Sequence, residues 1–251
     1  MGRIMIVAGE TSGDLHGGML VIELKKLDPK LEIYGIGGDR MQEAGMEPLY
    51  HVRDFSFMGF AEVLGHLPFI RSAFRRLEAE MERRRPDLLV LIDYPGFNLR
   101  LARVAKARGI PVVYYISPQV WAWGRHRVRR IKRLVDRMLC ILPFEEEFYR
   151  IRGVPARYVG NPLLDIARPS LSREAFARKH GLSASQPLVG LLPGSRHQEV
   201  ERILPAMLGA CQMLKNKQPS VQFALGLAPN IGQEGILNQA QRHGINPAIV
   251  A

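Results

Sequence analysis

Short apolar runs alternate with longer amphipathic segments along the chain, and this alternation restricts the possible folds more than any other feature. The predicted strands of the first part are Ile4–Ala8, Leu31–Ile36, Leu88–Ile92, Val112–Ile116, Met138–Leu142 and Ala156–Val159. The predicted helices are Asp14–Leu27, Ala61–Arg84, Leu99–Arg108, Trp121–Val135 and Phe144–Arg152. Several strands are apolar throughout, which is typical of parallel strands covered on both faces. The pattern predicts an α/β protein with a doubly wound parallel sheet, where ligands bind beyond the carboxyl ends of the strands.

The pattern pauses after Val159 and then starts again. Gly160-Asn161-Pro162 resembles a linker, and a polar helical region, Ser172–His180, follows it. The later predicted elements are strands Leu188–Leu192, Val221–Leu225 and Ala248–Ala251, and helices Val200–Lys215 and Gly232–His243. We predict two Rossmann-like domains, residues 1–165 and 166–251. Because two or three strands cannot bury both faces of a sheet, we expect the second domain to be incomplete in this chain.

Composition excludes several classes of protein. The 251 residues are 47% hydrophobic and include only two cysteines, which favours a globular fold in a reducing compartment over a disulfide-rich secreted one. No apolar run reaches the roughly 18 residues of a membrane-spanning helix. The N-terminus runs into a strand pattern and does not have the form of a signal peptide.

The loop after the first predicted strand combines glycines with carboxylates. Its sequence is Ala8-Gly9-Glu10-Thr11-Ser12-Gly13-Asp14. The glycines allow a tight turn and close approach of a ligand. Carboxylates at a helix N-terminus compete with phosphate for the same amides, so this loop should hold hydroxyls, such as those of a sugar. Asp14 could instead be only a helix cap.

A second candidate follows the strand Leu88–Ile92, in the segment Asp93-Tyr94-Pro95-Gly96-Phe97-Asn98. A lone carboxylate at the end of a buried strand would be partly desolvated, which would raise the pKa of Asp93 toward that of a general base. Alternatively, Asp93 caps the helix that begins near Phe97. Asn98 could bind a hydroxyl or be a turn residue.

The loop Pro193-Gly194-Ser195-Arg196 has the same placement in the second part and the opposite charge. Its amides and guanidinium suit a diphosphate. Glu199 and Glu201 could pair with Arg196, and the loop could be an ordinary turn with a surface arginine. Neither Asp-x-Asp, His-x-x-x-His nor Cys-x-x-Cys occurs, so we predict no metal and no cofactor.

The formal net charge is +11, and seven Lys or Arg residues against one Asp lie between Trp121 and Arg137. An apolar, aromatic-rich segment with arginines precedes them, and its candidate membrane or acyl-chain contacts are Phe57, Met58, Phe60, Leu64, Leu67, Phe69, Arg71 and Arg75. Basic residues beside apolar bulk favour an anionic membrane surface over nucleic acid. The alternative is that the apolar residues are core and the arginines a solvated face.

Several motifs together resemble the lipid-A-disaccharide synthase family of two-domain (GT-B) glycosyltransferases. They are Val7–Asp14, Phe57–Leu64, Ile92–Asn98, Tyr115–Trp123, Leu142–Glu145 and Leu191–Arg196. The resemblance is specific because six segments occur in the same order.

The resemblance implies a hexosyltransferase that joins UDP-2,3-diacylglucosamine to 2,3-diacylglucosamine 1-phosphate. The products are a β-1,6-linked disaccharide 1-phosphate and UDP, formed with inversion and without a metal. It also implies an acceptor domain followed by a UDP-sugar domain that meet across a cleft. A cytoplasmic location at the inner face of the inner membrane, a possible homodimer and no nucleic-acid partner are further expectations.

Site roles follow from the matching motifs. Asp93 and Glu10 become catalytic candidates, with Asp93 as the base. Substrate contacts are expected from Ser12, Gly13, Asp14 and Asn98, and donor-phosphate contacts from Gly194, Ser195 and Arg196.

The chain departs from the family pattern at Gly96, where some relatives would have an acidic residue, and in its length. We expect the donor's uridine site to lie beyond Ala251 and the 251-residue chain alone to be inactive. Alternatives are another UDP-sugar glycosyltransferase of this fold, for example of cell-wall precursor synthesis, or a non-catalytic basic protein that binds membrane or nucleic acid.

Overall fold

The computed structural model describes residues 2–55, 67–228 and 231–250. The chain forms two compact units, which divide between Ile166 and Ala167.

Unit 1 is built on a seven-stranded sheet in which every pairing is parallel. The strand order is β3-β2-β1-β4-β5-β6-β7. The strands are β1 (Arg3–Ala8), β2 (Glu32–Gly37), β3 (Glu47–His51), β4 (Leu88–Ile92), β5 (Val112–Tyr115), β6 (Arg137–Cys140) and β7 (Ala156–Tyr158). The chain winds in one direction from β1 to β3 and in the other from β4 to β7, which is the doubly wound topology expected from the sequence.

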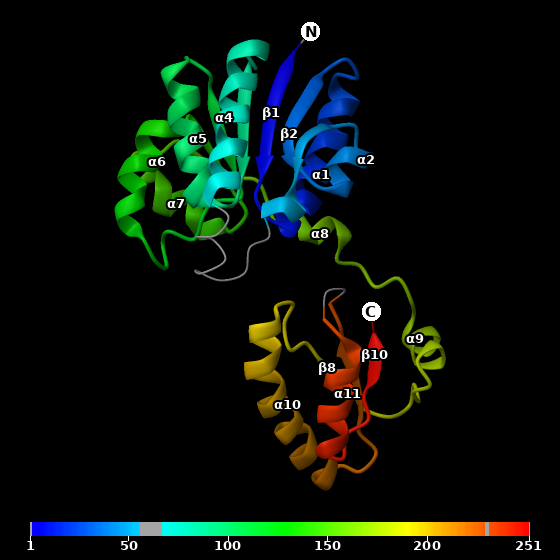
Figure 1. Ribbon diagram of the computed structural model, residues 1–251. Coiled ribbons are helices and arrows are strands. Elements are labelled where there is room, and N and C mark those ends of the chain that lie inside the picture. Colours follow the sequence, from blue (N-terminus) through cyan, green and yellow to red (C-terminus); the bar gives the residue numbers. More distant parts are fainter. Residues whose placement is uncertain (1, 56–66, 229–230, 251) are drawn as a thin grey trace. The chain divides into compact units, whose positions relative to one another are not determined.

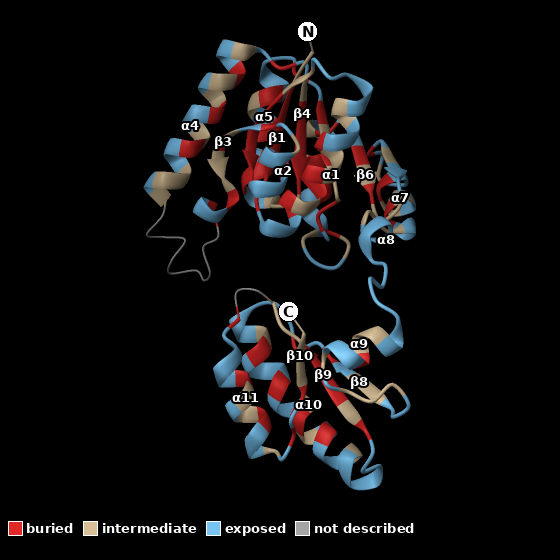
Figure 2. Ribbon diagram, turned by 90° about the vertical axis from the view of Figure 1, so that its right-hand side faces the viewer, coloured by how far each residue is buried: buried red, intermediate tan, exposed pale blue. Residues whose placement is uncertain are grey.

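Helices cover both faces of this sheet, with α1 and α2 on one side and α4, α5 and α6 on the other (Figure 1). The helices of unit 1 are α1 (Thr11–Leu27), α2 (Asp39–Glu43), α4 (Leu67–Arg84), α5 (Pro95–Ala107), α6 (Val128–Leu134), α7 (Pro143–Arg150) and α8 (Leu163–Ile166), with short 3-10 helices η1 (Val52–Phe55) and η2 (Arg125–Arg127). The central strands are almost entirely buried (Figure 2), which explains their continuous apolar sequences.

Unit 2 contains a parallel three-stranded sheet in the order β10-β9-β8. Its elements are α9 (Arg173–Lys179), β8 (Leu188–Leu191), α10 (His197–Lys217), β9 (Gln222–Gly226), α11 (Gln233–Arg242) and β10 (Ala248–Val250). Leu204, Leu208 and Leu225 are fully buried in a separate hydrophobic core. The α/β class and the parallel sheets expected from the sequence are confirmed.

Some predicted elements differ from the observed ones. The expected helix Trp121–Val135 begins only at Val128, because the chain first passes through Gly124 in the left-handed region and through η2. Helix α5 begins at Pro95, four residues before the expected start. Of the expected helix Ala61–Arg84, the part before Leu67 lies outside the described residues. Strand β3 and the short helices α2 and α8 were not predicted.

Candidate functional site

The strand order of unit 1 reverses between β1 and β4, so the loops that follow these two strands begin side by side. Ala8, the last residue of β1, pairs with Ile92, the last residue of β4. In open α/β sheets, ligands bind at this switch point, beyond the carboxyl ends of the strands. The structure thus brings together the two loops that the sequence singles out, around Glu10 and around Asp93.

Close packing explains the glycines of the first loop. A Cβ atom on Gly9 would lie 2.3 Å from the Cβ of Tyr94, so only glycine allows the Tyr94 side chain to cover this loop. Gly13 is buried, and its position faces the side chains of Ala8 and Ile92, which places the first turn of α1 over the ends of both strands. Glu10 precedes α1 and is exposed, as is Ser12. Burial raises the pKa of the Tyr94 hydroxyl, and the negative charge of Glu10 raises it further.

The second loop holds two consecutive residues in the left-handed region. Asp93 has a φ of 52° and Tyr94 a φ of 46°. A side chain makes this conformation costly, by about 1–3 kcal/mol per residue, and it recurs at functional sites where the surroundings impose it. Asp93 itself is half-buried. Its main-chain carbonyl accepts hydrogen bonds from Asn98 Nδ2 at 2.8 Å and from the Tyr114 hydroxyl.

His16 also belongs to this region, although the sequence analysis did not select it. It lies on α1, one helical turn after Gly13, and only 8% of its surface is exposed. Burial lowers the pKa of His16, and the negative charge of Asp93 partly opposes this effect. Its Nδ1 atom is buried and has no hydrogen-bond partner among the described residues.

Asp14 has a different role from the expected substrate contact. Its side chain is buried, and its Oδ1 accepts hydrogen bonds from the main-chain amides of Gly38 at 2.6 Å and Met41 at 3.1 Å. Oδ2 accepts one from the amide of Arg40 at 3.2 Å. Asp14 therefore caps the neighbouring helix α2 and not its own helix. Because main-chain amides bond to both carboxylate oxygens, the contacts of Asp14 favour a structural role over the expected substrate contact.

Asn98 is likewise buried and bonded to the main chain. It has no exposed surface. Its Nδ2 donates to the carbonyl oxygen of Ile92 at 3.2 Å as well as to that of Asp93. These contacts favour a role for Asn98 in supporting the main chain at the end of β4 over direct substrate contact.

The loop after β8 in unit 2 is occupied by one of the chain's own carboxylates. Glu199 Oε2 accepts hydrogen bonds from the amides of Ser195 at 3.1 Å and Arg196 at 3.2 Å, and Glu199 Oε1 lies 3.0 Å from Arg196 Nη1. These bonds, led by that from the Ser195 amide, lower the pKa of Glu199. Gly194 has a φ of 121°, and a Cβ there would lie 2.7 Å from Glu199 Cβ. These two amides and the guanidinium are hydrogen-bond donors of the kind that bind a phosphate, and here they bond to a carboxylate.

The candidate membrane residues fall into three groups. Phe57, Met58, Phe60 and Leu64 lie outside the described residues. Phe69 is half-buried, and its ring centroid lies 5.7 Å from that of Tyr50 and 5.3 Å from that of Phe55. This packing favours a core role for Phe69 over contact with an acyl chain. Leu67 is half-buried, whereas Arg71 and Arg75 are exposed on α4.

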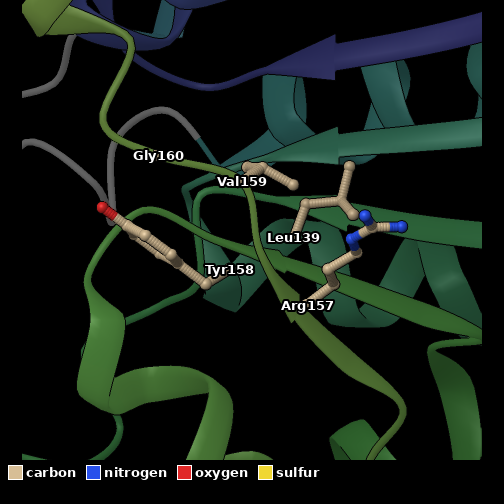
Figure 3. Close-up of a pocket in the computed structure, with 5 residues that line it drawn as sticks. All are labelled: Leu139, Arg157, Tyr158, Val159 and Gly160. Atoms are coloured by element: carbon tan, nitrogen blue, oxygen red, sulfur yellow. The ribbon is translucent and has the colours of Figure 1, made fainter.

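A shallow pocket lies where the edge strand β7 ends, away from β1 and β4 in the strand order. It is lined by Leu139, Arg157, Tyr158, Val159 and Gly160, and Figure 3 shows Arg157 and Tyr158 pointing to opposite sides of the strand. None of these residues is among the predicted site residues. Within residues 2–55, 67–228 and 231–250, no cluster of three His, Cys, Asp or Glu side chains could hold a metal ion. No helix in the described part of the chain is long and apolar enough to cross a membrane.

Comparison with known proteins gives one family. The family model described as lipid-A-disaccharide synthetase matches residues 4–249. The lipid-A-disaccharide synthase of Trichlorobacter lovleyi is 50% identical over 234 residues, which are 93% of this chain and 61% of that protein. The synthase of Myxococcus xanthus is 47% identical over 248 residues, which are 99% of this chain and 65% of that protein. The chain thus spans less than two thirds of the length of these relatives.

Solved structures share the fold at low sequence identity. The UDP-GlcNAc 2-epimerase from Neisseria meningitidis bound to UDP-GlcNAc matches with a TM-score of 0.68 at 11% identity, over 99% of this chain and 72% of that one. The UDP-N-acetylglucosamine 2-epimerase from Rickettsia bellii matches with a TM-score of 0.62 at 15% identity, over 100% of this chain and 69% of that one. These similarities establish the fold only.

Proposed function

The chain belongs to the lipid-A-disaccharide synthetase family, and from this membership we propose that it forms part of a hexosyltransferase of lipid A biosynthesis. The proposed donor is UDP-2,3-diacylglucosamine, and the acceptor is 2,3-diacylglucosamine 1-phosphate. The acceptor's 6-hydroxyl oxygen attacks the anomeric carbon of the donor. The bond from that carbon to the phosphate oxygen breaks, and UDP leaves with the electron pair. The product is a β-1,6-linked disaccharide 1-phosphate with inverted configuration at the donor carbon.

Asp93 is the proposed general base, and the observation that carries the proposal is its place beyond β4 at the switch point of the sheet. There its carboxylate would take the proton of the 6-hydroxyl, in the way that a positioned carboxylate accelerates attack by an alcohol. Glu10, Ser12 and Gly13 would line the hydroxyl-binding loop. Asp14 and Asn98 contribute by holding α2 and the end of β4. Residues 1–165 would accordingly be the acceptor-binding domain.

The loop Gly194–Arg196 is the proposed diphosphate contact, in a donor domain of which residues 166–251 form part. As the bond to UDP breaks, negative charge develops on the leaving oxygen, and nearby amides and a guanidinium would stabilise it. Glu199 holds the same donors in this structure. The donor's phosphates would therefore have to displace a carboxylate.

The complete protein that contains this chain provides the test. We expect it to release UDP when given detergent-dispersed diacylated donor and acceptor, and to do so much more slowly with a non-acylated acceptor. UDP release that depends only on a non-acylated acceptor would show that the enzyme belongs to another sugar-nucleotide pathway. Salt-sensitive binding of vesicles or nucleic acid without any UDP release would favour the non-catalytic alternative.

Peripheral contact with an anionic membrane is a further part of the proposal, supported by the exposed Arg71 and Arg75 on α4 and Arg125, Arg127 and Arg129 beyond β5. Each basic residue near an anionic surface contributes about 1 kcal/mol. The double variant Arg71→Glu, Arg75→Glu should thus bind phosphatidylglycerol vesicles at least about tenfold more weakly than the wild type. Equal binding by both proteins would place the contact elsewhere.

A further inference from the structure

Two buried donors from different elements converge on the main-chain carbonyl of Asp93. Asn98 on α5 donates through Nδ2 at 2.8 Å, and Tyr114 on β5 donates through its hydroxyl. Neither residue has any exposed surface. Because a carbonyl oxygen has two lone pairs, these two hydrogen bonds saturate it.

The same two bonds explain how Asp93 and Tyr94 keep a left-handed conformation without being glycines. Such a conformation persists only where the surroundings impose it. If the peptide after Asp93 rotated away, the Tyr114 hydroxyl and the Asn98 amide would lose this acceptor inside the core, which is unfavourable for buried polar groups. The buried donors therefore hold the strained turn in place.

Asn98 and Tyr114 can serve only as donors to the Asp93 carbonyl, and not as acceptors. Asn98 Oδ1 is buried and has no hydrogen-bond partner within the described part of the chain, while Nδ2 faces the carbonyls of Ile92 and Asp93. A flipped amide would set its oxygen against these carbonyl oxygens. Burial, and then the charge of Asp93, raise the pKa of Tyr114 well above its usual range, so its hydroxyl stays protonated and remains a donor.

We propose that Tyr114 and Asn98 are positioning residues for Asp93: by fixing its carbonyl, they fix the direction in which its carboxylate leaves the end of β4. This inference rests on the proposed function, since it takes Asp93 as the base. A general base must be held at hydrogen-bond distance from its proton, and small displacements are costly in rate. Neither Tyr114 nor Asn98 touches the substrate in this account.

The test removes one hydroxyl from the complete protein. We expect Tyr114→Phe to lower kcat about tenfold, as loss of one positioning hydrogen bond would, and to leave both KM values within about twofold. Tyr149→Phe is the matched control, because Tyr149 is also fully buried and donates to a main-chain carbonyl, that of Pro118 at 3.1 Å. We expect Tyr149→Phe to retain the wild-type kcat.

A double-mutant cycle separates positioning from a general structural effect. If Tyr114 acts through Asp93, then Tyr114→Phe lowers kcat by less than about twofold when Asp93→Asn is already present. An equal loss in both backgrounds, or no loss in the wild-type background, would overturn the positioning role while leaving the transferase assignment intact. A wild-type protein without transferase activity would instead overturn the proposed function, and this inference with it.

Discussion

The loops after β1 and β4 in unit 1 and the loop between β8 and α10 in unit 2 all follow the carboxyl ends of parallel strands, but different kinds of contact hold them. Around Asp93, buried side chains from α5 and β5 fix the main chain. At Ser195 and Arg196, the exposed loop before α10 is held by the carboxylate of Glu199, which lies in the first turn of that helix. The first arrangement is rigid before any substrate arrives, whereas the second is closed by a group that a phosphate could replace. This contrast fits a site of proton transfer in unit 1 and a site of reversible anion binding in unit 2.

Loss of the Asp93 carboxylate should have the largest effect. Asp93→Asn keeps the size of the side chain, and we expect it to lower kcat of the complete protein by about 10²–10⁴-fold, the usual contribution of a general base. The affinity for UDP, measured by calorimetry, should stay within about twofold. Asp28→Asn, at the other end of α1, is the control and should retain full activity.

Loss of the Arg196 guanidinium should weaken UDP binding, whereas loss of the Asp93 carboxylate should lower kcat. A charge-assisted hydrogen bond contributes about 1.5–3 kcal/mol, so Arg196→Ala should weaken UDP binding by about 10- to 100-fold. Arg202→Ala, a change of an exposed arginine further along α10, serves as the comparison. Unchanged inhibition by UDP in the Arg196 variant would remove the diphosphate role from this loop.

Neutralising Glu199 should change UDP binding in the opposite direction. Glu199→Gln removes the negative charge that competes for the amides of Ser195 and Arg196, and we expect UDP affinity to rise by about three- to tenfold, an amount typical of a weakened charged hydrogen bond. Glu201→Gln, on the same helix, should leave affinity unchanged. Weaker UDP binding in the Glu199 variant would mean that this carboxylate supports the ligand and does not compete with it.

The smallest expected effect concerns His16 and the acid stability of unit 1. Since the pKa of His16 is lowered in the folded protein, the unfolded chain takes up this proton first as the pH falls through about 6.5. Stability is therefore lost on acidification and is fully present above that pH. We expect His16→Gln to lose about 2 °C less in Tm than the wild type between pH 7 and pH 5. His126→Gln, an exposed histidine, should behave as the wild type; equal losses in all three proteins would contradict the assignment.

The sequence predicts the strands of this fold well because their apolar runs are continuous and covered on both faces. Strand β3 was not predicted, because its sequence Glu47-Pro48-Leu49-Tyr50-His51 has neither an apolar run nor a regular alternation. It lies at the edge of the sheet, where a strand can contain proline and does not need a continuous apolar sequence. Helix α2 has only five residues and is stabilised by Asp14 from another element.

The sequence predicts where the candidate site residues lie along the chain but not which residues they bond to. The loops chosen for their glycines and carboxylates lie together at one edge of the sheet of unit 1, because the parallel strands β1 and β4 both end there. Nothing in the sequence shows that Asp14 bonds to residues 24 to 27 positions away, or that Tyr114 reaches the carbonyl of Asp93. Such contacts depend on how α1, α2 and β5 pack, so the main-chain partners of Asp14 and Asn98 can be identified only from the structure.

The pH dependence of kcat/KM in the complete protein tests the assignment of Asp93 most directly. In the wild type, the rate should fall on the acidic side as the base becomes protonated, with a slope approaching tenfold per pH unit. In Asp93→Asn, the residual rate should be flat over the same range. An identical acidic limb in both proteins would show that another group takes the proton of the acceptor hydroxyl.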